Sequence, residues 1–264
     1  MQLLNWIFLF LISVGVLLSI KKNKLTTGGA LTGGIIAVLI LYGTGAMNVI
    51  MMAVYFILAI LATNYKRKEK QFFKNEETIK RDAFQVLANG GIAGLCGVAA
   101  LVFPYNIPLF IFLLAASLSS AIADTLSSEL GTVYGKNFVN ILTLKKDKKG
   151  LDGVVSFEGT LIGIGGSLII ALIYSWVSGW TIYSNLIVIA GTIGNLFDSI
   201  LGASLERKGI LGNNTVNFLN TLIAAFMAFL LLKVFNYTPE KEICWNWLRL
   251  ISQFDVKVKI FIFL

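Results

Sequence analysis

Eight long apolar stretches are the feature that most limits what this chain can fold into. A helix needs about 20 apolar residues to cross the ~30 Å hydrocarbon core of a bilayer. The stretches are residues 3–20, 25–42, 47–64, 83–103, 107–127, 154–176, 183–205 and 215–235. Only 14% of the residues are charged and the mean hydropathy is +0.79, whereas soluble domains carry about a quarter charged residues. The sequence therefore predicts an all-α polytopic membrane protein, a bundle of about eight transmembrane helices.

The basic residues indicate how these helices are oriented. Seventeen of the 22 lysines and arginines lie in alternate connections, which are residues 21–24, 66–81, 136–149 and 207–208. The intervening connections, 43–46, 104–106 and 177–182, contain none. By the positive-inside rule, the basic connections face the cytoplasm, so the net charge of +8 indicates membrane loops and no nucleic-acid partner. We expect a polytopic membrane domain over 1–235 and a C-terminal tail over 236–264, for which an interfacial placement is one interpretation.

Ionisable and amide side chains inside the spans cluster near the basic connections. A charged residue at a helix centre costs about 2.5 to 3.5 kcal/mol on insertion scales, so each position needs a reason. The residues are Asn89, Asp124, Glu129, Glu158, Asn195, Asp198, Glu206, Asn214 and Asn217. Snorkelling near helix ends explains Glu129, Glu158 or Glu206 singly, but it does not explain why the opposite ends lack acids. Spacings of three and four residues place polar side chains on one face of each of the last four spans, which predicts one polar chamber open to the cytoplasm.

The connection from Gly131 to Asp152 adds a basic group beside these acids. For any single lysine, a role as a membrane anchor is the simpler interpretation. As a group near carboxylates, Lys145, Lys146, Lys148 and Lys149 suit a polyphosphate whose Mg²⁺ the carboxylates hold. The sequence has no Walker A motif and no kinase catalytic loop. It also has no histidine, which excludes histidine bases and histidine metal ligands.

Five segments carry a resemblance to a known family. They are RDAFQVLANGG (81–91), ADTLSSELG (123–131), GVVSFEGT (153–160), GNLFDSILGAS (194–204) and NNTVNFL (213–219). In this order they resemble the integral-membrane family typified by human transmembrane protein 19 and plant phytyl-phosphate kinase, over residues 25–235. Family members often have Gly-Gly-Val-Ser before Leu-Gly-Thr, so Glu158 is not expected to be a shared catalytic residue.

The resemblance implies CTP-dependent phosphorylation of an isoprenoid monophosphate to the diphosphate, with Mg²⁺ as cofactor. It suggests Asp124 and Asp198 as catalytic magnesium ligands, with Glu129 assisting. The nucleotide or phosphate contacts would come from Asn89, Asn214, Asn217, Lys145, Lys146, Lys148 and Lys149. A prenyl monophosphate is itself a charged nucleophile, so this reaction does not require a histidine base.

Three alternatives stay open. A membrane cytidylyltransferase that makes a CDP-activated lipid would use the same groups but would release pyrophosphate. A small-solute transporter would need polar residues that continue to the far side of the membrane, and the sequence has few there. A non-enzymatic scaffold would leave the acidic cluster unexplained.

Overall fold

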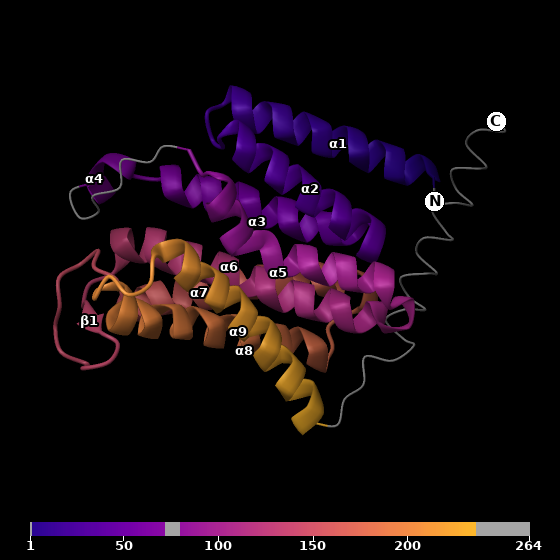
Figure 1. Cartoon of the computed structure of the whole chain (residues 1–264). Coiled ribbons are helices and arrows are strands. Elements are labelled where there is room, and N and C mark those ends of the chain that lie inside the picture. Colours follow the sequence, from indigo (N-terminus) through magenta and orange to yellow (C-terminus); the bar gives the residue numbers. More distant parts are fainter. Residues whose placement is uncertain (1, 72–79, 236–264) are drawn as a thin grey trace.

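The computed structural model describes residues 2–71 and 80–235, and these residues are mainly helical (Figure 1). Eight helices are long and apolar enough to span a membrane. They are α1 (Gln2–Lys21), α2 (Thr27–Thr44), α3 (Ala46–Asn64), α5 (Ala83–Val102), α6 (Ile107–Tyr134), α7 (Phe157–Ser178), α8 (Ile182–Leu201) and α9 (Asn213–Val234). The predicted all-α bundle of eight spans is confirmed. The predicted tail, 236–264, lies outside the described residues.

Short elements occupy the connections between the spans. They are α4 (Arg67–Gln71), the 3₁₀ turn η1 (Pro104–Asn106), the π-helical turn η2 (Gly202–Glu206), and the antiparallel strands β1 (Val139–Asn140) and β2 (Val154–Val155). The strand pair corrects one predicted boundary, because the span expected to start at Val154 starts at Phe157. Ser156 follows the strand and caps α7, since its side chain accepts a hydrogen bond from the backbone N–H of Gly159 at 3.1 Å.

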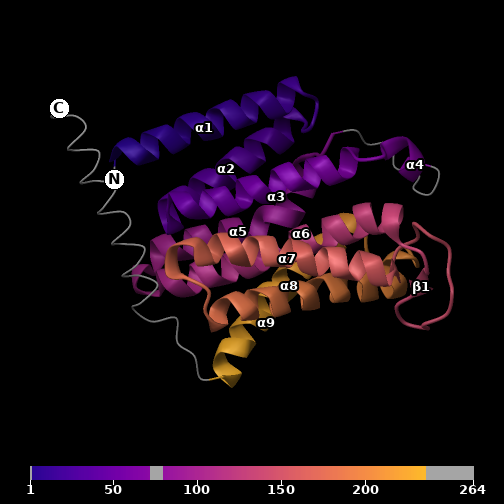
Figure 2. The same cartoon turned by 180° about the vertical axis from the view of Figure 1, so that it is seen from behind.

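Helix α6 is the centre of the bundle. It packs against α3, α5, α7, α8 and α9, and 78% of its apolar window is buried inside the protein. By contrast, α1 contacts mainly α2 and has only 6% of its window buried; both views show it along the edge of the bundle (Figures 1 and 2). Residues of α6 are therefore surrounded by other helices, whereas α1 is peripheral.

Helices α6 and α7 approach each other through glycines. A Cβ atom added to Gly159 would lie 3.1 Å from the backbone oxygen of Ser127, and one added to Gly163 would lie 3.1 Å from that of Ala123. The spacing of these two glycines predicts such tight packing, and the structure confirms it. The close approach brings the end of α6 that carries Asp124 against the start of α7.

The basic connections gather at one end of the bundle. In Figure 1, α4 and the loop that carries β1 both lie at the left end of the bundle, where α8 is also joined to α9. This arrangement puts α4, the β1–β2 loop and η2 around the ends of the central helices. A functional site at this end is therefore built from helix ends and the connections above them.

Candidate functional site

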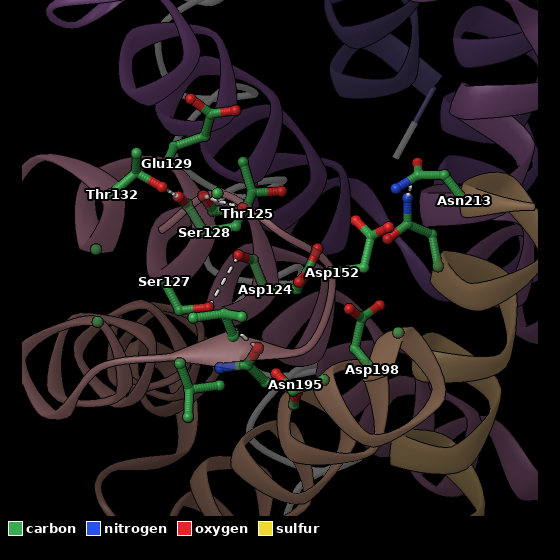
Figure 3. A pocket seen from close by; sticks show the side chains of 18 of the residues that line it. Asp124, Thr125, Ser127, Ser128, Glu129, Thr132, Asp152, Asn195, Asp198 and Asn213 are labelled. Carbon is green, nitrogen blue, oxygen red and sulfur yellow. Dashed lines mark hydrogen bonds between the residues drawn. The ribbon is translucent and has the colours of Figure 1, made fainter. Parts of the chain in front are cut away.

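A pocket of about 610 Å³ opens among the helix ends at the basic end of the bundle. Five of the sequence-predicted site residues line it, namely Asn89, Asp124, Glu129, Asp198 and Asn217. Figure 3 shows the side chains of Asp124, Asp152 and Asp198 directed into one space. The pocket therefore collects acids from α6, α8 and the β1–β2 loop, in the region where the sequence predicts a polar chamber.

Asp124 and Asp198 come from two helices that pack directly on each other, α6 and α8. Their carboxyl groups are close enough to interact, and Glu206 on η2 also lies within electrostatic range of Asp198. A neighbouring polar contact joins the same helices, because the hydroxyl of Ser127 donates to the Oδ1 atom of Asn195 at 3.1 Å. The acids are therefore held together by the packing of rigid helices.

Asp198 is oriented by a residue that sequence reasoning did not single out. Asn220 on α9 is fully buried, and its Nδ2 atom donates to the Oδ2 atom of Asp198 at 3.3 Å. The Oδ1 atom of Asn220 accepts a hydrogen bond from the hydroxyl of Ser120 on α6. Asn220 stands three residues after Asn217 in an apolar span, which is the signal that could have identified it.

The donor set suits a magnesium ion that is shared with a phosphate substrate. No three Asp, Glu or Cys side chains in the described ranges converge into a ready metal site. Mg²⁺, however, is commonly bound through one or two carboxylates plus substrate phosphates and water. Asp124 and Asp198 supply two carboxylates that are close enough to interact, and a cation bound by both would relieve their repulsion. The residues present therefore fit a substrate-bound Mg²⁺.

Glu129 has a structural partner within the pocket wall. Its carboxylate forms an ion pair with the ammonium group of Lys70 on α4, and both side chains are nearly inaccessible to solvent. Lys70 also donates to the backbone oxygens of Ala62 at 2.7 Å and Thr63 at 3.0 Å. The pair joins α4 to α6 and to the end of α3, a role that the sequence-based assignment of Glu129 did not include.

The predicted phosphate-binding lysines lie outside the pocket lining. Within the described ranges the lining includes residues 150–155 of the β1–β2 loop, but it does not include Lys145, Lys146, Lys148 or Lys149. The first three are exposed, and the Nζ atom of Lys149 lies 5.6 Å from the centre of the Phe138 ring. Their part in phosphate binding therefore stays a prediction.

The same loop is clamped by Arg207, which follows η2. The guanidinium group of Arg207 donates from Nη1 to the Oδ2 atom of Asp147 at 2.8 Å, and from Nε to the backbone oxygen of Asp152 at 2.5 Å. The hydrogen bond from Arg207 lowers the pKa of the Asp147 carboxyl, and the backbone N–H of Lys148 contributes to the same shift. The clamp fixes Asp152 at the pocket.

At the start of α9, the pocket is lined by Asn213 in place of the predicted Asn214. Asn213 and Asn217 line the pocket, and the Nδ2 atom of Asn217 donates to the Oδ1 atom of Asn213 at 2.9 Å. Asn214 is not among the lining residues. Residues four apart share a helix face, so Asn213 follows from Asn217 once the start of the helix is known.

Sequence reasoning also missed a basic part of the lining. Lys24, Arg67 and Arg81 border the pocket together with Lys70. The sequence places all of them in basic connections, where a role as membrane anchors is the simpler interpretation. The signal that separates Arg81 from its neighbours is its position at the start of the family-like segment 81–91.

Comparisons with known proteins agree with this architecture. The family model described as "Integral membrane protein DUF92" matches residues 10–225. An uncharacterized membrane protein of Methanocaldococcus jannaschii is 34% identical over 238 residues, which cover 88% of this chain and 96% of that protein. An uncharacterized membrane protein of Synechocystis is 32% identical over 215 residues, covering 78% and 82%. The chloroplastic protein VTE6 of Arabidopsis thaliana is 28% identical over 252 residues, covering 89% and 72%. No solved structure matches the chain significantly.

Proposed function

The chain belongs to the DUF92 family of integral membrane proteins, and on that premise we propose that it phosphorylates an isoprenoid monophosphate to the diphosphate, with CTP as phosphoryl donor. The observation that carries the proposal is the pocket in which Asp124 and Asp198 meet beside basic side chains. The resemblance of the motifs to the phytyl-phosphate kinase family supports the choice of substrate.

The proposed reaction needs no proton transfer. An oxygen of the lipid monophosphate attacks the γ-phosphorus of CTP and forms the new P–O bond. The bond from the γ-phosphorus to the β,γ-bridging oxygen breaks, and its electron pair stays on the departing CDP. Both oxygens belong to phosphate anions, so positioning and charge neutralisation are the main requirements. This agrees with a chain that has no histidine.

The residues of the pocket have separate roles in the proposed reaction. Asp124 and Asp198 would hold a Mg²⁺ that neutralises charge on the β- and γ-phosphates. Asn89 and Asn217 line the same pocket and can donate hydrogen bonds from their amides to phosphate or nucleotide. The positive-inside pattern supports a cytoplasmic location for this end of the bundle, where the nucleotide would be available.

The test uses purified protein in detergent with farnesyl, geranylgeranyl and phytyl monophosphates. CTP is radiolabelled at either the γ- or the α-phosphate, and the lipid fraction is counted. Transfer of the γ-label with release of CDP supports the proposal. Transfer of the α-label with release of pyrophosphate identifies a cytidylyltransferase instead, and transfer of neither label in the presence of Mg²⁺ overturns both activities.

Variants of the two aspartates show whether this pocket performs the transfer. Asp124→Asn and Asp198→Asn should each lower turnover by at least about 100-fold, because one magnesium ligand is lost. Glu158→Gln is the matched control. Glu158 is an acid in the first turn of α7 and does not line the pocket. Normal turnover by either aspartate variant removes that residue from the site.

A further inference from the structure

Three partly buried basic side chains line the pocket from separate segments of the first third of the chain. Lys24 follows α1, Arg67 lies on α4 and Arg81 precedes α5. We infer that Lys24, Arg67 and Arg81 form a subsite for the phosphate group of a phosphomonoester lipid. The inference rests on the proposed function for the identity of that lipid as the phosphoryl acceptor.

The backbone holds Lys24 and Arg81 side by side. The N–H of Arg81 donates to the backbone oxygen of Lys24 at 3.1 Å, and the N–H of Thr26 donates to that of Arg81 at 3.0 Å. The approach is so close that a Cβ atom at Gly29 would lie 2.6 Å from the backbone oxygen of Arg81. Because two cations are already held together, an anion that binds both loses less affinity to ordering them.

Neutral side chains orient the two cationic groups. The Nη2 atom of Arg81 donates to the Oγ1 atom of Thr63 at 3.4 Å, and the Nζ atom of Lys24 donates to the Oδ1 atom of Asn64 at 3.1 Å. Thr63 and Asn64 are consecutive residues at the end of α3. A guanidinium group carries five N–H donors and an ammonium group three, so these contacts use only a minority of the donors.

Lys70 differs from these three residues although it borders the same pocket. Its ammonium group donates to two backbone oxygens and to the carboxylate of Glu129, which occupies all three of its N–H donors. Lys70 therefore belongs to the wall of the pocket, and the subsite consists of the other three cations.

The subsite lies next to the acidic part of the pocket. The hydroxyl of Tyr55, which is buried on α3, lies within electrostatic range of both Arg81 and Asp124 and interacts with the Arg81 side chain. A phosphate on Arg81 would therefore be close to the carboxylates that are proposed to hold the magnesium nucleotide. This is the arrangement that an acceptor phosphate needs for transfer between two bound substrates.

Apolar residues of α3 indicate where the hydrocarbon chain of the ligand would lie. Ile60 lines the pocket, and its neighbours Ile57 and Leu61 are 54% and 60% exposed. In a membrane-spanning helix such residues face lipid or other apolar groups. A phosphate on the subsite can therefore carry a hydrocarbon chain that leaves the pocket along α3, which favours a lipid phosphomonoester over free phosphate.

The experiment measures binding and does not depend on turnover. The full chain in detergent is titrated with farnesyl monophosphate in the absence of nucleotide and Mg²⁺, with farnesol and inorganic phosphate as separate probes. The test variant is Lys24→Gln/Arg67→Gln/Arg81→Gln. The control is Lys22→Gln/Lys68→Gln/Lys80→Gln, which removes the same charge from exposed lysines in the same connections.

The test variant should raise the Kd for farnesyl monophosphate by at least about 100-fold, since each contact to a charged group contributes about tenfold or more. The control should change it less than about threefold, and binding of farnesol should be the same in both. Lys24→Gln and Arg67→Gln as single variants should each show about a tenfold increase, which covers the case in which the triple variant does not fold.

The outcomes separate this inference from the proposed function. Equal binding of farnesyl monophosphate by the wild type, the single variants and the folded triple variant overturns the subsite, whatever the turnover. So does a wild-type protein that binds farnesyl monophosphate no more tightly than farnesol. Inorganic phosphate that binds as tightly as the lipid would overturn the assignment to a lipid. A protein with the expected binding that transfers no phosphoryl group overturns the proposed function alone.

Discussion

The ammonium group of Lys70 and the carboxylate of Glu129 form a buried ion pair that attaches α4 to the central helix α6. The two side chains are only 5% and 11% exposed, so neither charge can be hydrated if its partner is lost. Because removal of one partner leaves the other charge buried, this pair is a sensitive point in the structure.

Glu129→Gln should therefore destabilise the protein by about 3 kcal/mol, measured as thermal or SDS-induced unfolding in detergent. The double variant Lys70→Met/Glu129→Leu should recover most of the loss, because no buried charge remains. A double variant that is stable but inactive would show that Glu129 also acts in the reaction. Unchanged stability of Glu129→Gln would contradict the structural role.

Asn220→Ala should weaken Mg²⁺ binding, because Asp198 loses a side chain that orients it. The variant removes the amide that donates to Asp198 and accepts from Ser120. Loss of an orienting partner typically costs 10- to 100-fold in metal affinity, so the Mg²⁺ concentration for half-maximal turnover should rise by about that factor. Asn185→Ala, which changes an exposed amide near the start of α8, should leave the Mg²⁺ dependence unaltered. A pure loss of stability without a shift in Mg²⁺ dependence would refute the orienting role.

The four lysines of the β1–β2 loop should affect nucleotide binding by long-range electrostatic attraction. They lie outside the pocket lining, so Lys145→Gln/Lys146→Gln/Lys148→Gln/Lys149→Gln should raise the KM for nucleotide only severalfold at low salt. The difference from wild type should vanish at about 1 M salt, where charges more than about 3 Å apart are screened. An effect that persists at high salt would indicate direct contact with phosphate, as the sequence alone suggests.

The clamp between Asp147 and Arg207 should respond to acid. The pKa of Asp147 is lower in the folded protein than its usual value of about 3.9. The clamp is therefore at full strength above that value and is lost as the pH falls through the lowered pKa. At pH 6 the backbone amides of residues 139–155 should exchange hydrogen more slowly in the wild type than in Asp147→Asn. The two proteins should converge once the pH is low enough to protonate Asp147 in the wild type. Identical exchange at pH 6 would show that the clamp does not hold the loop.

The orientation in the membrane can be tested with single cysteines at two exposed positions. Lys148 and Asn106 lie in connections at opposite ends of α6. In a cysteine-free background in intact cells, an impermeant maleimide should label Asn106→Cys. It should label Lys148→Cys only after permeabilisation. Labelling of both positions in intact cells would exclude the predicted orientation.

The spans could be predicted from the sequence because their signal is local. Twenty consecutive apolar residues have few alternatives, since backbone polar groups must be satisfied within the membrane. The meeting of Asp124 and Asp198 also followed from local information, namely their position at the same end of two spans. Even so, the hydropathy pattern did not predict that α6 extends to Tyr134, or that a strand pair precedes the start of α7 at Phe157.

The basic part of the pocket could not be predicted in the same way. The closeness of Lys24 and Arg81 depends on two backbone hydrogen bonds between segments separated by two spans. Lys145, by contrast, stands in a more conspicuous cluster, but its loop is attached to Arg207, which lies more than 50 residues further along the chain. Tertiary contacts therefore decide which cationic side chains face the pocket, and these contacts cannot be inferred from the composition.

The hydrogen-bonded path from Ser120 through Asn220 to Asp198 has a consequence for how the protein is made. Helices enter the membrane in chain order as synthesis proceeds, and α8 enters before α9 exists. Until α9 arrives, Asp198 lacks the Asn220 amide that orients it in the finished protein. Newly made chains that end before Asn220 should therefore pack α8 against α6 and α7 but leave Asp198 without this amide partner. The arrival of α9 is then the step that completes the hydrogen-bonded path to Asp198.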